Sequence, residues 1–281
     1  MNSLKTIFLF GLLGLFLVFL GRIFGGSTGM YGMLVFSLIM NVGMYFFSDR
    51  IAIKSAGAKK MSRKKYPGIY RAVESLSKEA KIPMPKIYLS GMNQPNAFAT
   101  GRNPQNSAVV LTKGLINNLS PAEVKGVIAH ELAHIKNRDI LLATIASVIA
   151  SSVFALSDFI RFGSLFGSSD EDRNPIYDIL ISLLAPLVAI IIQMAISRER
   201  EFKADATGSK ISGDSENLAL ALEKIENLAH RTETPEVNPA FASLYISNPF
   251  GGGEISGFIQ KLFSTHPPVT ERVERLRNMR R

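Results

Sequence analysis

The chain has 281 residues, of which 47% are hydrophobic, and it carries a formal net charge of +9 without a single cysteine. The missing cysteines exclude disulfides and thiolate metal ligands, so any metal must be held by His, Asp or Glu. The apolar residues are grouped in long blocks, which indicates a membrane protein, and the positions of the basic residues must decide what the net charge means.

Two apolar blocks near the N-terminus are expected to form a membrane hairpin over residues 1–50. The first, Thr6–Leu20, continues beyond Arg22, whose side chain can extend to the membrane surface. The second, Gly29–Phe47, has about the 20 residues that a helix needs to cross the hydrocarbon core. Residues 25–27, Gly-Gly-Ser, are expected to form the turn. A cleaved secretory signal is the alternative for the first block, but no small-residue cleavage site follows it.

A small sheet and a helix are expected next. Strands are predicted near Lys86–Ser90 and Ala108–Thr112, joined by a turn-rich segment. A helix is predicted to begin after Ser120, which can act as its N-cap. Pro121 suits the first helical position, and Glu123 completes a capping box.

The predicted helix carries the sequence HELAH, in which His130 and His134 are four residues apart. Two imidazoles one turn apart on the same face can hold one zinc ion, which lowers the pKa of a bound water towards about 7. Glu131 can accept the proton of that water and pass it to the leaving amine. This spacing is the H-E-x-x-H signature of zinc metalloproteases, but it is short, so its context must support it.

A second apolar hairpin is expected over residues 140–196. Its two blocks, Ile140–Ile160 and Ile176–Ile196, are each long enough to cross a membrane. Their Ser and Ala residues suit close packing of helices in lipid. The alternative is a buried helical hairpin within a water-soluble domain.

A third metal ligand is expected directly after this hairpin, in the sequence SREREFKADATG. Glu201 can complete the metal site, and Asp205, one helical turn later, can accept the N–H of a ligating histidine. Glu199 is the alternative ligand, but it points about 200° away from Glu201 around a helix, so only one of them can face the metal. An out-and-back hairpin returns this segment to the side of the histidines.

Near the C-terminus, His266 precedes a predicted helix in the sequence FSTHPPVTERVERL. It can donate a hydrogen bond to the oxyanion that develops during hydrolysis. The alternative is that His-Pro-Pro only caps the helix. His230 is expected to have no catalytic role.

The basic residues indicate an orientation. Nearly all Lys and Arg residues lie between residues 48 and 139 or after residue 196, and the two connecting turns contain few. By the positive-inside rule, both long segments are expected in the cytoplasm. Topology thus explains the net charge, which argues against a nucleic-acid partner.

These motifs together resemble the HtpX family of integral-membrane zinc metalloproteases, relatives of the CaaX prenyl endopeptidases. The resemblance covers nearly the whole chain, through the two N-terminal spans, NAFATG, HELAHIKNRD, the apolar hairpin, EFKAD and STHPPVTERVERL. In such families the second motif is E-x-x-x-D with the glutamate as metal ligand, which selects Glu201 over Glu199. The resemblance also implies one Zn2+ per chain and a multi-pass protein of the bacterial plasma (inner) membrane.

The expected fold is a mainly α membrane protein in which four apolar helices accompany a cytoplasmic α+β zincin-like domain with a small sheet. The expected parts are an N-terminal hairpin (1–50), a protease part with the H-E-x-x-H helix (51–139), an apolar hairpin (140–196) and a protease part with the third ligand (197–281). Proteases of this kind usually bind substrate as a strand added to a sheet edge. The edge expected here is Asn96, Ala97, Phe98 and Ala99, with an ordinary loop as the alternative.

The expected activity is zinc-dependent hydrolysis of misfolded or damaged membrane proteins at the cytoplasmic face of the membrane. Specific processing of lipid-modified or membrane-anchored peptides is one alternative. A non-enzymatic membrane scaffold is another. Glu131 argues against the scaffold, because a structural zinc site needs no base and usually closes with four protein ligands.

Overall fold

The computed structural model describes residues 2–146, 148–149, 197–231, 246 and 267–279, which form helices and one small sheet. The second apolar hairpin, predicted over 140–196, lies almost entirely outside the described residues; its first residues, 140–146, are helical. The described elements are α1 (Asn2–Ser55), β1 (Lys59–Lys60), α2 (Pro67–Ala80), β2 (Lys86–Ser90), β3 (Ala97–Asn103), β4 (Asn106–Thr112), α3 (Lys113–Asn118), α4 (Pro121–Asn137), α7 (Arg198–Ser212), α8 (Glu216–Arg231) and α10 (Val269–Asn278).

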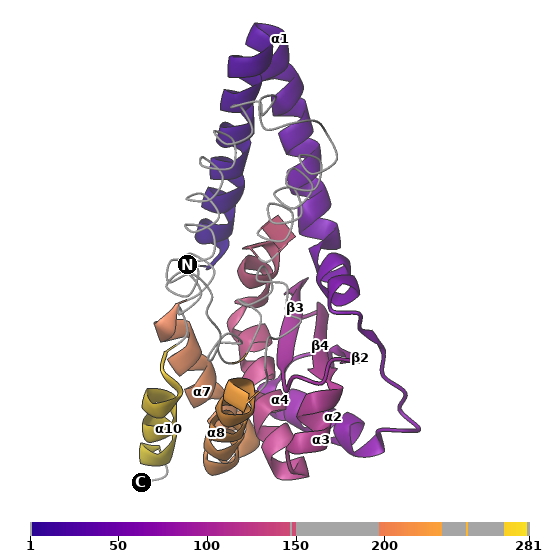
Figure 1. Ribbon diagram of the computed structural model, residues 1–281, viewed down its shortest axis with the longest axis vertical. Coiled ribbons are helices and arrows are strands. Elements are labelled where there is room, and N and C mark those ends of the chain that lie inside the picture. Colours follow the sequence, from indigo (N-terminus) through magenta and orange to yellow (C-terminus); the bar gives the residue numbers. More distant parts are fainter. Residues whose placement is uncertain (1, 147, 150–196, 232–245, 247–266, 280–281) are drawn as a thin grey trace, which may run out of the picture.

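The predicted N-terminal hairpin is formed by α1, which bends sharply at Gly25 and Gly26 (Figure 1). Gly26 has a φ of 56°, in the left-handed region that glycine adopts without steric cost. The two arms approach each other closely beside the bend, where a Cβ atom on Gly21 would collide with the carbonyl oxygen of Gly29. The Gly-rich turn predicted from the sequence therefore lies where the chain reverses.

Both arms of α1 are long and apolar enough to cross a membrane, over Thr6–Ile23 and Gly25–Ser55. Among the described residues, every exposed large apolar side chain except Met84 and Met279 lies on α1. Such a concentration of exposed apolar surface is unfavourable in water and suits contact with lipid. The second arm continues as a helix beyond its predicted end at Phe47.

The sheet has the strand order β1-β2-β4-β3, in which β2 and β4 are parallel and the other neighbours are antiparallel. The two predicted strands are confirmed. Between them, residues 97–103 form β3, so the segment expected to be turn-rich contains a strand, which includes Ala97–Ala99 of the expected sheet edge. This strand is buried on both faces: Phe98 packs with Ala52 of α1, and Ala97 and Ala99 belong to the main core. Gly101, with a φ of 135°, lies at a register shift near its end.

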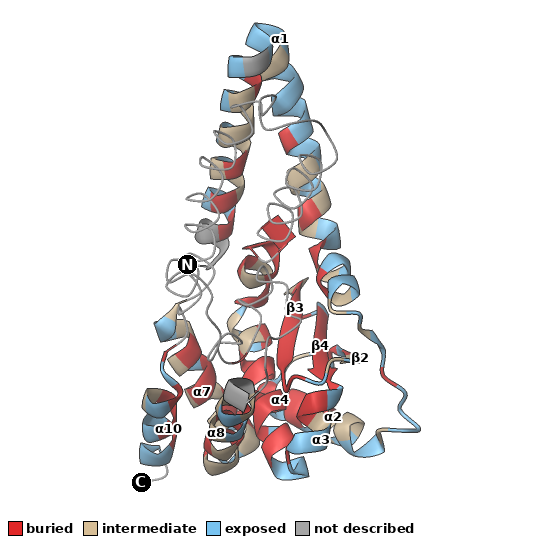
Figure 2. Ribbon diagram, in the orientation of Figure 1, coloured by how far each residue is buried: buried red, intermediate tan, exposed pale blue. Residues whose placement is uncertain are grey.

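The helix α4 lies at the centre of the main core and is buried along most of its length (Figure 2). Glycines let neighbouring helices approach it. A Cβ atom on Gly208 of α7 would lie 2.9 Å from the backbone nitrogen of His130, and one on Gly126 would lie 2.9 Å from that of Leu218 in α8. Both contacts are tighter than a larger residue tolerates, so α7 and α8 are held against the helix that carries the H-E-x-x-H motif.

The start of α4 agrees with its sequence signals. The Ser120 hydroxyl accepts a hydrogen bond from the Glu123 backbone N–H, and the Glu123 carboxylate accepts one of 2.7 Å from the Ser120 N–H. The other Glu123 oxygen lies 2.6 Å from the Lys224 ammonium. Burial raises the pKa of Glu123, but the contacts with Lys224 and Ser120 together lower it by more than burial raises it. The pKa of Glu123 is therefore below its ordinary value of 4.5.

Replacing Glu123 with glutamine is expected to destabilise the fold by about 1 kcal/mol at neutral pH, because the charge at the helix N-terminus and its ion pair are lost. Since the folded pKa is depressed, this stabilisation is present above the unfolded pKa and disappears as the pH falls through the folded value. The free energy of unfolding, measured against pH for Glu123→Gln and wild type, should therefore converge in acid. A difference that persists at low pH would show that charge is not its source.

Candidate metal centre

Three metal-ligand side chains meet between α4 and α7. His130 and His134 project from α4, and Glu201 projects from the first turn of α7. Their ligand atoms all lie within 4.8 Å of one another. The two Nε2 atoms are 3.1 Å apart, and the Glu201 oxygens lie 3.5 Å from His130 Nε2 and 3.7 Å from His134 Nε2. Two motifs far apart in the sequence thus form one cluster.

These separations fit a zinc ion. With metal–ligand distances of about 2.0–2.2 Å, neighbouring ligands of a tetrahedral zinc site lie about 3.4 Å apart, and the three observed separations bracket that value. Two imidazoles and one carboxylate are also a donor set of catalytic zinc sites, which keep a fourth position for water. Among the described residues this group offers three side chains that could bind a metal, the number of protein ligands that catalytic zinc sites use.

The alternative ligand, Glu199, is exposed and does not belong to this group. It precedes Glu201 by two residues, which on a helix places its side chain on a different face. Glu201 itself is buried against α4. The geometry therefore favours Glu201 as the third ligand.

Each histidine has a carboxylate partner behind it. Asp205 Oδ1 lies 2.9 Å from His130 Nδ1, and Asp139 Oδ2 lies 3.3 Å from His134 Nδ1. A carboxylate that accepts the Nδ1–H fixes the tautomer and leaves Nε2 for a metal. The sequence predicted Asp205 in this position but not Asp139. Arg138, with a φ of 59°, ends α4 and turns the chain so that Asp139 returns to His134.

A buried arginine, Arg272 of α10, joins this arrangement. Its side chain is completely buried, and it donates two hydrogen bonds to the Asp205 carboxylate, of 2.8 Å from Nε and 2.7 Å from Nη2. Its Nη1 donates to the carbonyl oxygen of Ile246 at 2.8 Å and lies 3.8 Å from Glu201. This two-pronged contact holds the carboxylate that orients His130.

Arg272 was not among the predicted site residues, although the sequence around it indicates its burial. In VTERVERL, Val269, Val273 and Leu276 repeat with helical spacing and are buried. Arg272 precedes Val273 and follows Val269 by three residues, so it lies on the same face. A charged residue on the apolar face of a helix is expected to have a buried partner.

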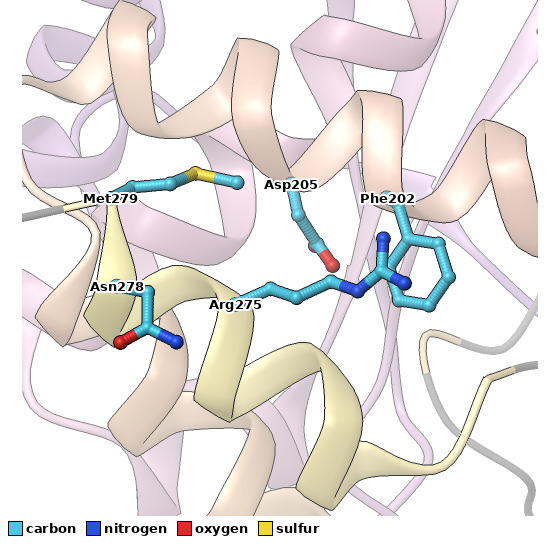
Figure 3. Close-up of a pocket in the computed structure, with 5 residues that line it drawn as sticks. All are labelled: Phe202, Asp205, Arg275, Asn278 and Met279. Carbon is cyan, nitrogen blue, oxygen red and sulfur yellow. The ribbon is translucent and has the colours of Figure 1, made fainter.

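A second contact fixes α10 against α7. The guanidinium of Arg275 lies 3.7 Å from the centre of the Phe202 ring, within cation–π distance. Figure 3 shows this stacking beside Asp205, at a cavity of about 350 Å³ between the two helices. Helix α10 thus contacts α7 at two points, Asp205 and Phe202.

Burial and charge set the protonation of the site. Burial lowers the pKa of His130, but the carboxylates of Asp205 and Glu201 raise it more, so that it reaches about 9. Burial raises the pKa of Glu131, and neighbouring imidazoles offset only part of this. Burial also raises the pKa of Asp205, but the ion pair with Arg272 outweighs this effect. The pKa of Asp205 is therefore below its ordinary value, and the carboxylate stays ionised. Glu131 is thus a stronger base than an ordinary glutamate.

The sheet edge lies next to Glu131. Its Oε2 accepts a hydrogen bond of 2.7 Å from the backbone N–H of Ala99 in β3, the last strand in the described sheet. The Asn96 carbonyl accepts from the Thr112 N–H of β4, and successive residues of an antiparallel strand alternate in direction. Ala97 and Ala99 therefore direct their backbone polar groups away from β4, towards the edge where no described strand pairs with β3.

The other predicted site residues have different positions. The Asn96 side chain is buried and accepts a hydrogen bond from the Ile246 N–H at 3.2 Å, and Phe98 is part of the packing against α1. Within the predicted edge segment, these two side chains are structural, and only the backbone of Ala97 and Ala99 faces the edge away from β4. His266 and the side chain of His230 lie outside the described residues.

Comparisons with known proteins agree with this geometry. The model of the peptidase family M48 matches residues 63–280. A protease HtpX homolog from Pelotomaculum thermopropionicum is 44% identical over 99% of both chains, and one from Persephonella marina is 46% identical over 100% of this chain and 98% of its own. The crystal structure of Ste24p from S. mikatae has a similar fold, with a TM-score of 0.51 and 23% identity; 98% of this chain matches 64% of that one.

Proposed function

The chain belongs to peptidase family M48, and on that basis we propose that it is a zinc-dependent endopeptidase that degrades misfolded or damaged membrane proteins at the cytoplasmic face of the membrane. The family and the relatives make it a membrane metalloprotease. The identity of the metal, the substrates and the side of the membrane are the proposed parts. The observation that carries the proposal is the cluster of His130, His134 and Glu201 beside the base Glu131, which contacts the last strand of the described sheet.

The residues of the cluster have separate tasks. His130, His134 and Glu201 would hold one Zn2+, which when bound supplies Lewis-acid activation of water for attack on a peptide carbonyl. Glu131 accepts the proton of the attacking water and delivers it to the leaving amine. The raised pKa of Glu131 suits both steps, because a base whose pKa lies closer to the working pH can both accept and return the proton.

A substrate in extended conformation can pair with β3. The backbone groups of Ala97 and the Ala99 carbonyl, which point away from β4, can form main-chain hydrogen bonds to an added strand. Since the Ala99 N–H already contacts Glu131, such a strand would pass directly beside the base. Main-chain pairing recognises extended backbone rather than a particular side chain, which suits proteins that have lost their fold.

The membrane setting supports the choice of substrate. The H-E-x-x-H helix and the Glu201 segment border the two ends of the predicted hairpin 140–196, so the site is expected close to the membrane surface. The parts 51–139 and 197–281 would together form the cytoplasmic protease domain, and 1–50 and 140–196 its membrane part. We also propose a bacterial inner-membrane location, which the resemblance to bacterial HtpX homologs supports.

Zinc removal tests the proposal. Purified protein treated with a chelator is expected to lose hydrolysis of an unfolded membrane protein, and added Zn2+ is expected to restore it. The same preparation should leave the folded form of that substrate intact. Product mass spectrometry shows whether cleavage occurs at many sites, as degradation requires.

Two other outcomes separate the alternatives. Cleavage of one lipid-modified peptide at a single bond, with no hydrolysis of unfolded proteins, would instead indicate a processing peptidase. Metal-loaded protein that hydrolyses neither substrate would indicate a membrane scaffold. Hydrolysis that survives complete metal removal would contradict zinc catalysis.

A further inference from the structure

A basic cavity of about 150 Å³ lies where the end of α1 meets the sheet, away from the metal-ligand cluster. Its lining includes three cationic side chains from three elements: Arg50 of α1, Lys86 of β2 and Arg102 of β3. Asp49 is the one carboxylate among its lining residues. Ala52, two residues after Arg50, packs with Phe98 of β3 and Val110 of β4, so this end of α1 is held against the sheet.

The three cations lack acidic partners. Within the described part of the chain, neither Arg50, Lys86 nor Arg102 forms an ion pair. The two guanidinium groups lie over aromatic rings instead, Arg102 at 5.0 Å from the centre of Phe46 and Arg50 at 5.4 Å from that of Phe47. Rings orient the cations without neutralising them. Like charges around one cavity repel each other, and a bound anion relieves that repulsion.

The position of the cavity along α1 identifies the source of the anion. A helix crosses the hydrocarbon core with about 20 residues, and the second arm of α1 runs from the bend at Gly26 to Ser55. By this length, Phe46 and Phe47 lie at the far surface of the core. Asp49 and Arg50 follow at the depth of the lipid headgroups.

We propose that this cavity binds the phosphate headgroup of an anionic phospholipid. Basic pockets beside membrane helices bind such headgroups, whose phosphate can contact all three cations while the acyl chains remain in the bilayer along α1. The bound lipid would join α1 to β2 and β3. The proposal depends on α1 crossing the membrane and is independent of the reaction at the metal-ligand cluster.

Lipid retention tests this site. Full-length protein is reconstituted in nanodiscs that contain phosphatidylglycerol and phosphatidylcholine in equal amounts. The protein is then released from the nanodiscs, and the lipids that remain bound to it are identified by native mass spectrometry. Wild type is expected to retain phosphatidylglycerol selectively. Each of Arg50→Gln, Lys86→Gln and Arg102→Gln should weaken retention about fivefold, and all three together about 100-fold. Asp49→Asn should strengthen it, because it removes the one lining carboxylate.

A charge-matched control separates a built site from general attraction to the membrane. Lys64, Lys65 and Lys125 are exposed and lie outside the cavity. Replacing these three lysines with glutamine removes the same charge and is expected to leave selective retention unchanged. Equal losses in the two triple variants, or a weaker hold after Asp49→Asn, would overturn the proposal.

Two further titrations identify the ligand class. Inorganic phosphate and an Asp- and Glu-rich peptide are each added to lipid-free protein in detergent, and protection against thermal unfolding is compared with that given by short-chain phosphatidylglycerol. Protection by the lipid alone, absent from the cavity triple variant, is the expected result. Stronger protection by free phosphate or by the peptide would replace the lipid as the ligand and refute the assignment.

Discussion

Glu131→Gln is expected to lower kcat/KM for peptide hydrolysis by between about 100-fold and about 10,000-fold, the range that general acid–base catalysis supplies. Glutamine has nearly the same shape as glutamate but cannot accept the proton of the attacking water. Its amide oxygen can still accept the hydrogen bond from the Ala99 N–H, so the contact between α4 and β3 is kept. Steady-state rates and metal content are measured on the same preparations, and the zinc content should equal that of wild type.

The matched control is Glu199→Gln, which removes a carboxylate from an exposed position on α7 near the site. Its rate and zinc content are expected to remain those of wild type. Glu201→Gln, by contrast, should lose zinc as well as activity, because it removes a proposed ligand. If Glu131→Gln retained the wild-type rate, or if Glu199→Gln lost zinc while Glu201→Gln kept it, the assignment of roles would be wrong.

The features that could be predicted from sequence depend on local signals. The start of α4 follows from Ser120, Pro121 and Glu123, which are close in sequence and contact one another in the structure. The shared face of His130 and His134 follows from helical geometry once the helix is established. The bend at Gly25 and Gly26 likewise depends on a local backbone preference.

The features that could not be predicted depend on packing between distant segments. Of β3, only a sheet edge at Asn96–Ala99 was predicted, and the strand extends to Asn103 because α1 and the main core bury its two faces. Arg272 carries a charge that is typical of the surface, and its burial requires the Asp205 carboxylate, which lies 67 residues earlier in the chain. Asp139 reaches His134 only because the chain reverses at Arg138.

One chain of contacts joins these distant segments. Asn96 at the start of β3 accepts from the Ile246 N–H, the Ile246 carbonyl accepts from Arg272, and Arg272 holds Asp205 against His130. The strand proposed to receive substrate and the histidine proposed to hold zinc are thereby positioned by the same arginine. The C-terminal helix is for this reason part of the architecture of the site, although none of its described residues is a metal ligand.

Arg272→Met is expected to weaken zinc binding by about 10- to 100-fold, because carboxylates behind a ligating histidine contribute that much when they are lost or displaced. Methionine fills much of the space but leaves the buried Asp205 carboxylate without its two hydrogen bonds. Breaking a buried ion pair on one side costs about 3–5 kcal/mol, so the fold should also be less stable. Zinc affinity, from competition with a chelator of known affinity, is measured on protein whose helical content matches wild type.

A second variant separates positioning from folding. Adding Asp205→Asn to Arg272→Met removes the unpaired buried charge, so stability should recover in part while zinc affinity stays low, because a neutral amide holds the His130 Nδ1–H less strongly than a carboxylate. Arg272→Lys restores the charge without the two-pronged geometry and should give an intermediate affinity. Arg277→Met, at an exposed position of α10 whose contacts are with Glu216 and Glu223 of α8, is the control that should keep wild-type affinity. Wild-type zinc affinity in folded Arg272→Met would show that Arg272 only stabilises the fold.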